Sequence, residues 1–326
     1  MRRDLRRARR AGFTLIELLV VIAILALLAA LIAAGIGKVR EGEQSRVTNQ
    51  TLTKLQLAIN NQWKTICDKC RDEKNTYTTP NKHPEFAKLV AICDGDVSRA
   101  ESLWMFMNLR RNMPESFEEA RNDVTVWNAT KTDFVTLRKS AAFKEIQNST
   151  VTGQPEEESA ALLYIILGQG GRGNTFSIDD AMQGAQTQLT FGGLSLSAFK
   201  DGFGNYVAFR RFYQSAELNS GEYGRTRDAK MLQKGVDPMD DPLDDRGKLK
   251  LWPNAKAKDY AEKAVFNQAT VPPQTFDGRN RIATAISAGV DSRDQTEGQK
   301  HQAFRSPNEN DNAFGYRVGR QGTKGD

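Results

Sequence analysis

The chain has 326 residues, with 46 Lys and Arg against 40 Asp and Glu, a formal net charge of +6, three Cys and two His. Its mean hydropathy of −0.56 is that of a water-soluble globular protein, large enough for one large domain or two small ones. Three cysteines exclude a disulfide-dense scaffold. A single apolar run is long enough to cross a bilayer, so a polytopic membrane protein is excluded as well.

Most of the excess positive charge lies in the first 12 residues. This leader holds six arginines and one acidic residue, Asp4, whereas the rest of the chain carries 40 basic and 39 acidic side chains. The isoelectric point of about 9.1 therefore reflects the leader alone. Because the body of the chain is nearly neutral, no nucleic-acid partner is predicted. The arginines are Arg2, Arg3, Arg6, Arg7, Arg9 and Arg10.

The apolar run follows this leader closely. Leu18–Ile36 has 19 residues without a charge, and as a helix it would cover about 28 Å of hydrocarbon. We expect a transmembrane helix over residues 13–37. The arginines before it place the leader in the cytoplasm by the positive-inside rule. The protein is therefore expected to pass once through the cytoplasmic (inner) membrane, with a periplasmic or extracellular head.

A carboxylate inside the apolar stretch distinguishes this segment from ordinary signals. A cleavable signal peptide has a shorter apolar core, of about 7 to 15 residues. A plain signal anchor fits the length of the run but leaves Glu17 unexplained. An ionised side chain costs about 2.5 to 3.5 kcal/mol at the centre of a membrane helix and somewhat less near its end, so Glu17 needs a partner.

The leader and the apolar run meet in the sequence Gly12-Phe13-Thr14-Leu15-Ile16-Glu17. This junction resembles the N-terminal signal of type IV pilins and of type II secretion pseudopilins. The resemblance implies that a prepilin peptidase cleaves after Gly12, that Phe13 is then N-methylated, and that Glu17 acts in assembly. Cleavage exposes an α-amino group that is mostly protonated near neutral pH, and this cation can pair with Glu17 of a neighbouring subunit and fix the register of two packed helices.

The resemblance implies a non-enzymatic structural subunit of a pilus-like filament, either a type II secretion pseudopilus or a type IV pilus. Its expected partners are prepilin peptidase, other pilin-like subunits and an inner-membrane assembly platform. The alternative is a membrane-anchored extracytoplasmic binding module that does not polymerise, because the head is large for a major pilin. No motif places a nucleophile beside His83 or His301, so an enzyme ranks last.

Beyond the predicted membrane segment, apolar residues recur at spacings of three and four, which is the period of one helix face. We therefore expect an amphipathic helical stem over residues 38–71, within one helix of about 88 Å that starts at Phe13. Gly35, Gly37 and Gly42 each cost about 0.8 to 1 kcal/mol in a helix interior, so they either weaken the helix or allow close packing. The apolar residues are Leu52, Leu55, Ile59, Trp63, Ile66 and Cys70.

The expected fold class is α+β, in the lollipop arrangement of pilins. Residues 72–150 are interpreted as a helical insertion, because helical faces at 86–93 and 100–107 flank Asp94-Gly95-Asp96, and residues 133–146 have a third amphipathic pattern. Residues 151–326 are expected to form a pseudopilin-like head with a small antiparallel sheet and a loop-rich C-terminus.

A second resemblance lies in residues 199–209, which contain Asp201-Gly202-Phe203-Gly204-Asn205-Tyr206. They resemble the D-x-W-G-N-P motif at the start of the sheet in major-pseudopilin-like proteins, with Phe203 for Trp and Tyr206 for Pro. The glycines and Asn205 favour a turn and residues 206–213 favour a strand, so an ordinary hairpin is the other interpretation. Residues 286–291 are similar to the family's S-A-G-x-D stretch, and residues 312–318 are expected to form a terminal strand.

Four residues have the composition of a zinc site. Cys67 and Cys70, with His83 and Cys93, form the pattern C-x2-C-x12-H-x9-C. A disulfide between Cys93 and either Cys67 or Cys70 is an alternative in an oxidising compartment. Free thiols in the core are a third.

Acidic loops offer oxygen ligands for calcium, the one cofactor that the sequence suggests besides zinc. Asp291 and Asp294 lie near the C-terminus, where the resemblance implies that some pseudopilin heads bind Ca²⁺. A second loop lacks the glycine and closing Glu of an EF-hand, so we interpret it as a solvated loop. It contains Asp237, Asp240, Asp241, Asp244 and Asp245.

Residues 168–173 match the pattern G-x-G-x-x-G. The βαβ unit that dinucleotide binding requires is not evident around them, so the run is expected to end a helix and open a loop.

Overall fold

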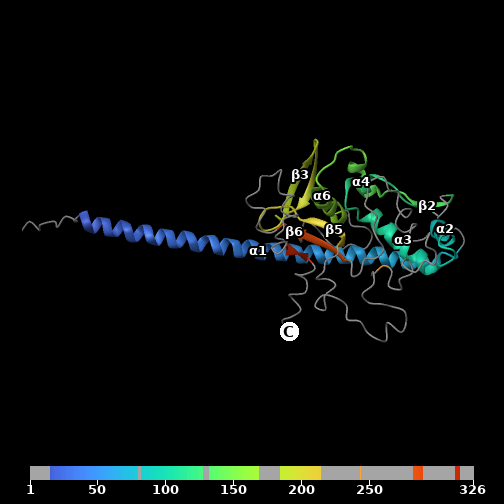
Figure 1. Cartoon of the computed structure of the whole chain (residues 1–326), viewed down its shortest axis with the longest axis horizontal. Coiled ribbons are helices and arrows are strands. Elements are labelled where there is room, and N and C mark those ends of the chain that lie inside the picture. The colour runs from blue at the N-terminus through green and yellow to red at the C-terminus, as the bar shows by residue number, and fades with distance from the viewer. Residues whose placement is uncertain are drawn as a thin grey trace, which may run out of the picture. The chain divides into compact units, whose positions relative to one another are not determined.

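The computed structural model describes residues 15–79, 82–127, 132–168, 184–213, 243, 282–288 and 313–315 (Figure 1). The side chains of residues 32–38, of Ile282 and of Ala313 are outside this description. The chain divides into two units, Met1–Arg46 and Val47–Asp326. The described elements are helices and short antiparallel sheets, so the expected α+β class is confirmed.

The longest element is α1 (Leu15–Thr76), one helix that starts in the first unit and continues into the second. It confirms that the apolar segment and the stem form a single helix, and it ends shortly after the predicted end at Arg71. The helix runs through Gly35, Gly37 and Gly42 without a break. Ala and Leu, both strong helix formers, dominate the sequence before Gly35.

In the first unit the apolar side chains of α1 are exposed. Every Leu, Ile and Val from Leu15 to Leu31 has at least 46% of its surface exposed, and Leu15 reaches 82%. Over the residues that the structure describes, no helix combines the length and the hydropathy expected of a membrane span.

In the second unit one face of α1 is buried. Leu52, Leu55 and Ile59 have no exposed surface, and Ile66 and Cys70 have almost none. The spacing of apolar residues therefore predicted the buried face of the stem correctly.

Three helices follow: α2 (Pro84–Ile92), α3 (Val97–Asn112) and α4 (Phe117–Arg121). Asp94 and Gly95, with φ of 58° and 80°, form the turn between α2 and α3. The Asp96 carboxylate accepts the backbone N–H groups of Ser98 and Arg99, both at 3.1 Å, and so caps α3. The predicted helix pair and its turn are confirmed.

A β-hairpin interrupts the block that we expected to be helical throughout. β1 (Val124–Trp127) pairs with β2 (Phe134–Leu137), from Val124 opposite Leu137 to Trp127 opposite Phe134. The expectation of a helix over residues 133–146 is therefore wrong for residues 134–137, although η1 (Ala141–Phe143) and α5 (Lys144–Gln147) follow. The β-branched and aromatic residues here alternate in burial, which suits a half-buried strand better than a helix.

The next elements are α6 (Pro155–Gly168), β3 (Gln186–Phe191) and β4 (Leu194–Phe199). Residues 160–163 of α6 are fully buried. β3 and β4 form a hairpin whose turn, Gly192-Gly193, has positive φ at both residues. α6 is described as far as Gly168, the first residue of the glycine run. Residues 169–183 lie outside the described part of the chain.

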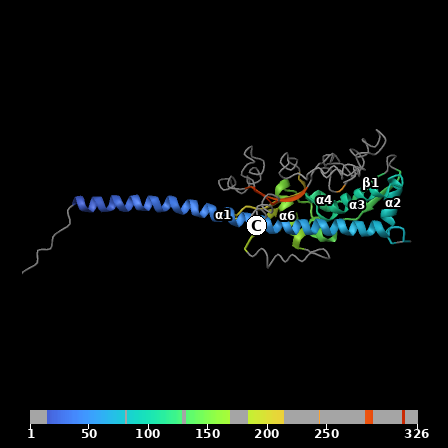
Figure 2. The same ribbon diagram turned by 90° about the horizontal axis from the view of Figure 1, so that it is seen from below.

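A three-stranded antiparallel sheet has the order β5 (Ala208–Tyr213), β6 (Ile282–Ser287), β7 (Ala313–Phe314). It confirms the strand predicted at residues 206–213, and in the described residues the expected terminal strand is shorter than predicted. Helix α6 packs on β4 and β5. Figures 1 and 2 show β6, drawn in orange, next to α1 in both views.

Side chains from elsewhere in the chain accept three backbone N–H groups of β5. Ser159 Oγ accepts the backbone N–H of Phe209 at 3.2 Å. Glu115 Oε1 accepts the N–H groups of Arg211 and Phe212 at 2.5 and 3.2 Å. β5 lies at one end of the strand order β5-β6-β7, and the register of its pairing with β6 is irregular between Arg210 and Tyr213, so side chains take up N–H groups that the sheet does not use there.

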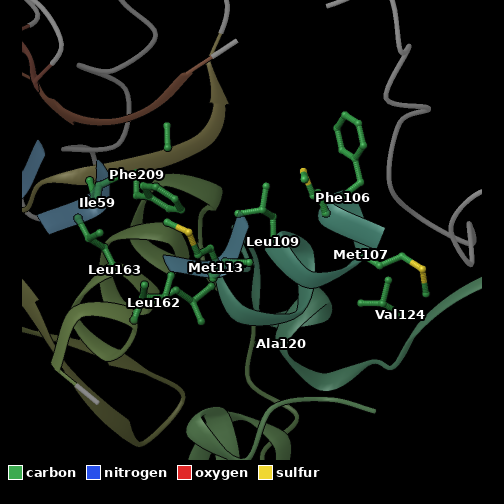
Figure 3. Packing of buried hydrophobic residues seen from close by; sticks show 14 of the residues in the cluster. Ile59, Phe106, Met107, Leu109, Met113, Ala120, Val124, Leu162, Leu163 and Phe209 are labelled. Carbon is green, nitrogen blue, oxygen red and sulfur yellow. The ribbon is translucent and has the colours of Figure 1, made fainter. Parts of the chain in front are cut away.

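One core joins the helical block to the sheet. Figure 3 shows Ile59 of α1, Leu109 of α3, Leu163 of α6 and Phe209 of β5 in the same cluster. The helices that precede the sheet in the sequence are thus part of the head and share its core.

Buried charges reinforce this junction. Arg211 of β5 has no exposed surface, and its Nη1 donates to the Met113 carbonyl at 2.8 Å and to Glu119 Oε2 at 3.0 Å. Arg110 Nε lies 3.1 Å from Glu119 Oε1. Burial acts to raise the pKa of Glu119, but Arg211 and Arg110 more than offset it, so the pKa lies below its ordinary value. α3, α4 and β5 are therefore joined by a buried ionic cluster.

Candidate functional site: the processing segment and the Asp201 turn

Two regions carry the residues that the sequence singled out, and the first is the N-terminal segment. Gly12 and Phe13 lie outside the described residues. Glu17 lies in the first turn of α1 and is exposed. It is the one acidic or basic residue between Leu15 and Gly37. Around it, a helix surface made almost wholly of exposed Leu, Ile, Val and Ala is far more apolar than the surface of a soluble monomer.

The second region is the turn after β4. Asp201 is 4% exposed, and its Oδ1 accepts the backbone N–H groups of Phe203 and Asn205, both at 2.9 Å. Asp201 N–H donates to the Asn205 carbonyl at 2.8 Å, and Gly204, with φ of 89°, donates to the Asp201 carbonyl at 3.1 Å. The side chain therefore holds its own turn closed, as an aspartate at the start of a tight turn does.

The same carboxylate reaches the C-terminal sheet. Ser287 Oγ, at the end of β6, donates to Asp201 Oδ2 at 2.7 Å, and Ser287 has no exposed surface. The two head segments that resemble pseudopilin motifs, far apart in sequence, thus meet through one hydrogen bond. On the other side of the turn, Gly202 N–H donates to Thr48 Oγ1 of α1 at 3.0 Å.

Tyr206, one of the two departures from the D-x-W-G-N-P motif, takes part in the pairing around this turn. Tyr206, in place of proline, is 3% exposed and forms an antiparallel bridge with Lys200. Val207 N–H donates to the Phe199 carbonyl at 2.8 Å, so the strands continue past the turn. The segment is therefore a hairpin-like connection from β4 to β5, and its carboxylate binds outside the hairpin as well.

Burial sets the electrostatics of Asp201. Desolvation raises the pKa of Asp201 above its ordinary value, and the hydrogen bonds from Ser287, Asn205 and Phe203 offset this only in part.

The three cysteines are buried free thiols. Cys67, Cys70 and Cys93 are 4%, 1% and 0% exposed and none forms a disulfide. Burial raises the pKa of Cys67 and of Cys93 to about 12 and raises the pKa of Cys70 as well. Of the three alternatives that the sequence left open, the structure thus has the free thiols.

The structure does not bring the candidate zinc ligands together in the residues it describes. Among the residues that the structure describes, no three His, Cys, Asp or Glu side chains are grouped as a metal site. His83 is the N-cap residue of α2. The candidate calcium ligands Asp291 and Asp294, and the acidic residues from Asp237 to Asp245, lie outside the described part of the chain.

The sequence analysis missed the polar residues of α1 that bind the head. Thr48 and Gln56 precede and follow Leu52 by four residues, so both lie on its helix face. They are 2% and 6% exposed. A polar side chain at a core-facing position needs a hydrogen-bond partner, and this signal was available from the spacing.

Residues 7–33 match the family model described as a prokaryotic N-terminal methylation motif. No curated protein and no solved structure gives a significant match to the chain. The match covers the end of the leader, Gly12, Phe13, Glu17 and most of the apolar run. The chain therefore carries a prepilin signal of the type found in type IV pilins and pseudopilins. Such a signal implies processing by a prepilin peptidase and assembly with other pilin-like subunits.

Proposed function

We propose that the protein is a structural, non-enzymatic subunit of a pilus-like filament, a type II secretion pseudopilus or a type IV pilus. Prepilin peptidase cleaves after Gly12 and Phe13 becomes the methylated first residue. The segment from Phe13 to about Gly37 anchors the subunit in the cytoplasmic membrane with the leader inside. The head then lies in the periplasm or outside the cell, in the pilin-like arrangement of stem and head.

The observation that supports this proposal best is the exposed apolar surface of α1. Every large apolar side chain from Leu15 to Leu31 is exposed in the single chain. Such a surface requires either lipid or the same surface of other subunits, and a filament subunit uses lipid before assembly and helix packing afterwards. Glu17 then pairs with the amino group of Phe13 from a neighbour.

A second candidate is a membrane-anchored binding module that does not polymerise. The hairpin of β1 and β2 favours this second candidate. Phe134 is 52% exposed, and the centroid of its ring lies 4.7 Å from that of Trp127. Trp127 is half-buried, and a pair of one exposed and one half-buried aromatic ring suits a binding surface. In either case Asp291 and Asp294 are proposed Ca²⁺ ligands of the head.

The first test is mass spectrometry of the mature membrane protein. The proposal requires an N-terminus at Phe13 that carries one extra methyl group. Replacing Gly12 by Leu places a bulky side chain at the cleavage position, and we expect this variant to keep its leader. A mature chain that begins at Met1, or after Ala29, would contradict the processing step.

The second test separates filament subunit from anchored monomer. A photo-reactive residue at Leu25, which is 59% exposed, should yield ladders of cross-linked subunits in membranes that contain the assembly machinery. The same residue at Val39, which is 74% exposed but lies beyond the proposed membrane segment, is a matched control on the same helix. Ladders from Leu25 that disappear with the Gly12→Leu variant support assembly after processing, and only monomers would favour the anchored module.

A further inference from the structure

Three chain segments far apart in sequence meet at the Asp201 turn. The turn bonds to Thr48 of α1 across 154 residues and to Ser287 of β6 across 86 residues. All three side chains are almost fully buried, at 4%, 2% and 0% exposure for Asp201, Thr48 and Ser287. The position of α1 and the end of β6 are therefore linked through five residues, 201–205.

A carboxylate or its amide isostere is needed at this position. Asp201 Oδ1 accepts two backbone N–H groups, and Oδ2 accepts the Ser287 hydroxyl. An apolar side chain would leave buried donors without an acceptor and would release the turn that aims Gly202 N–H at Thr48. Asparagine can keep the bonds, because its Oδ1 accepts the N–H groups while its Nδ2 donates to Ser287 Oγ.

Several polar side chains of α1 bind the head, among them Lys74, whose Nζ lies 2.7 Å from Glu101 Oε2. Thr48 accepts from Gly202, Gln56 binds β6, and Glu73 Oε2 accepts from Trp104 Nε1 at 2.6 Å. Of these, the Thr48 bond lies closest along α1 to the apolar segment of residues 15–31. A force that acts on the apolar segment would therefore load this bond before the bonds of Gln56 and Glu73.

We propose that Asp201 is a positioning residue for assembly, which holds α1 at Thr48 in fixed relation to the end of β6 at Ser287. This inference rests on the proposed function, since it assigns a part in filament formation to a residue far from the processing signal. Without the link, Thr48 and the first turns of α1 in the second unit move relative to the sheet. Subunits that pack through α1 then present their heads at variable positions.

The link itself is tested without any filament. The full chain in detergent is unfolded with denaturant for Thr48→Val, Ser287→Ala and the double variant. We expect the two substitutions to be coupled by about 3-fold to 10-fold in the unfolding equilibrium constant, because both act on one turn. The coupling should vanish when the cycle is repeated with Asp201→Ala. Thr53→Val, an exposed threonine of the same helix, is the control and should show no coupling to Ser287→Ala.

Additive effects of Thr48→Val and Ser287→Ala would overturn the link. Coupling that survives Asp201→Ala would overturn the role of Asp201, because the two residues would then be connected by another route.

The role in assembly is tested with Asp201→Ala and Asp201→Asn by the Leu25 cross-linking ladders. We expect Asp201→Ala to reduce the yield of ladders at least tenfold at normal membrane level and normal processing, and Asp201→Asn to restore most of it. Normal ladders from Asp201→Ala would overturn the positioning role and leave the proposed function intact. If the unmodified protein gives no ladders, the proposed function fails, whereas the coupling measurement still decides whether the link exists.

Discussion

The side-chain amide of Gln56 in α1 is hydrogen-bonded to β6 through both its oxygen and its nitrogen. The oxygen bonds to Thr284 and the nitrogen to the preceding residue, Ala283. Thr284 Oγ1 donates to Gln56 Oε1 at 3.0 Å, and Gln56 Nε2 donates to the Ala283 carbonyl at 2.8 Å, across 228 and 227 residues of sequence. Because Thr284 has no exposed surface, these bonds are shielded from water. They fix the register of the sheet on the stem.

Gln56→Leu should therefore destabilise the head although the core gains an apolar side chain. The Ala283 carbonyl would lose a buried donor, at about 1 to 3 kcal/mol. The Thr284 hydroxyl would keep only the Ala285 carbonyl, at 3.2 Å, as its acceptor. Gln50→Leu, at an exposed position of the same helix, should change stability by less than about 0.5 kcal/mol. Denaturant unfolding of the full chain in detergent, followed by tryptophan fluorescence, measures both. Equal effects of the two variants would contradict the role assigned to Gln56.

Glu17→Gln should leave membrane insertion unchanged or improved, because an uncharged side chain is less costly in hydrocarbon. Assembly should fail, since the amino group of a neighbouring Phe13 would be buried without a carboxylate, at about 3 to 5 kcal/mol. Such a cost corresponds to a loss of about two to more than three decades in an assembly step.

Glu41→Gln is the matched control, because it makes the same chemical change on α1 beyond the apolar segment. Membrane level, N-terminal processing and incorporation into sheared filaments are measured together for both variants. Normal incorporation of Glu17→Gln would rule out pairing with the amino group. Loss of all membrane protein would show that Glu17 acts in insertion instead.

Arg211→Met should cost about 3 to 5 kcal/mol of stability. The substitution removes the cation from the buried cluster but leaves the carboxylate of Glu119 in place. The neighbouring Arg210 is the control, since its side chain is 35% exposed and its pair with Glu156 is 3.4 Å long. Arg210→Met should cost less than about 1 kcal/mol. If the unfolding midpoints of Arg211→Met and Arg210→Met differ little, the stabilising role assigned to the buried cluster is wrong.

The ionic cluster also predicts a pH dependence. The pKa of Glu119 is below its ordinary value in the folded chain, so its carboxylate contributes stability above its unfolded pKa of about 4.3. This contribution is lost as the pH falls through the lower, folded pKa. Removing Arg211 should make the stability less dependent on pH in this acidic range, as unfolding curves from pH 6 down to about 3 would show.

The buried thiols should be unreactive in the folded protein. Burial raises the pKa of Cys67 and of Cys93 to about 12, so almost no thiolate forms at pH 8, and the sulfur atoms are shielded from reagents. Alkylation should be on the order of 100-fold slower in the native than in the unfolded chain. Ser45→Cys places a thiol at an exposed position of α1 and should react at the rate of an unfolded thiol. Rapid native labelling of the three wild-type thiols would contradict their placement.

Gly153→Ala should destabilise the head. A Cβ atom at residue 153 would lie 2.5 and 2.7 Å from two ring atoms of Phe191, and this ring is 3% exposed and packed edge-on against Phe117. The strain should cost about 1 to 3 kcal/mol. Gly42→Ala is the opposite case, since no atom lies within 4 Å of the added Cβ and a helix gains about 1 kcal/mol. Opposite shifts of the unfolding midpoint are expected, and a stabilised Gly153→Ala chain would show that Phe191 can move.

The elements that were predicted correctly are those with local signals. The spacing of Leu52, Leu55 and Ile59 indicated which face of α1 is buried, and Asp94 with Gly95 marked the turn between α2 and α3. The hairpin of β1 and β2 was missed, because four-residue strands are too short to separate a period of two from a helical pattern.

The candidate site was also predictable only in part, because some of its residues have local signals in the sequence and others meet only in the fold. The processing signal is contiguous, so the methylation motif could be found without a structure, while the roles of Gly12, Phe13 and Glu17 stay predictions. The contact between Asp201 and Ser287 joins residues 86 positions apart, and no local pattern specifies which donor a buried carboxylate will meet. The buried position of Arg211 was also beyond prediction, because its compensating carboxylate, Glu119, comes from α4, more than 90 residues earlier in the chain.

The side-chain bonds to the N–H groups of β5 affect how the heads behave when many of them are close together. Filament subunits are held at high local concentration, where an open row of N–H donors would serve as a template for strands of adjacent molecules. Ser159 and Glu115 already occupy the donors of Phe209, Arg211 and Phe212. Recruitment of further chains by this edge would first have to displace a carboxylate and a hydroxyl from inside the fold. In the proposed filament, these bonds would hinder neighbouring heads from joining strand to strand through β5, and order between subunits would depend on their helices.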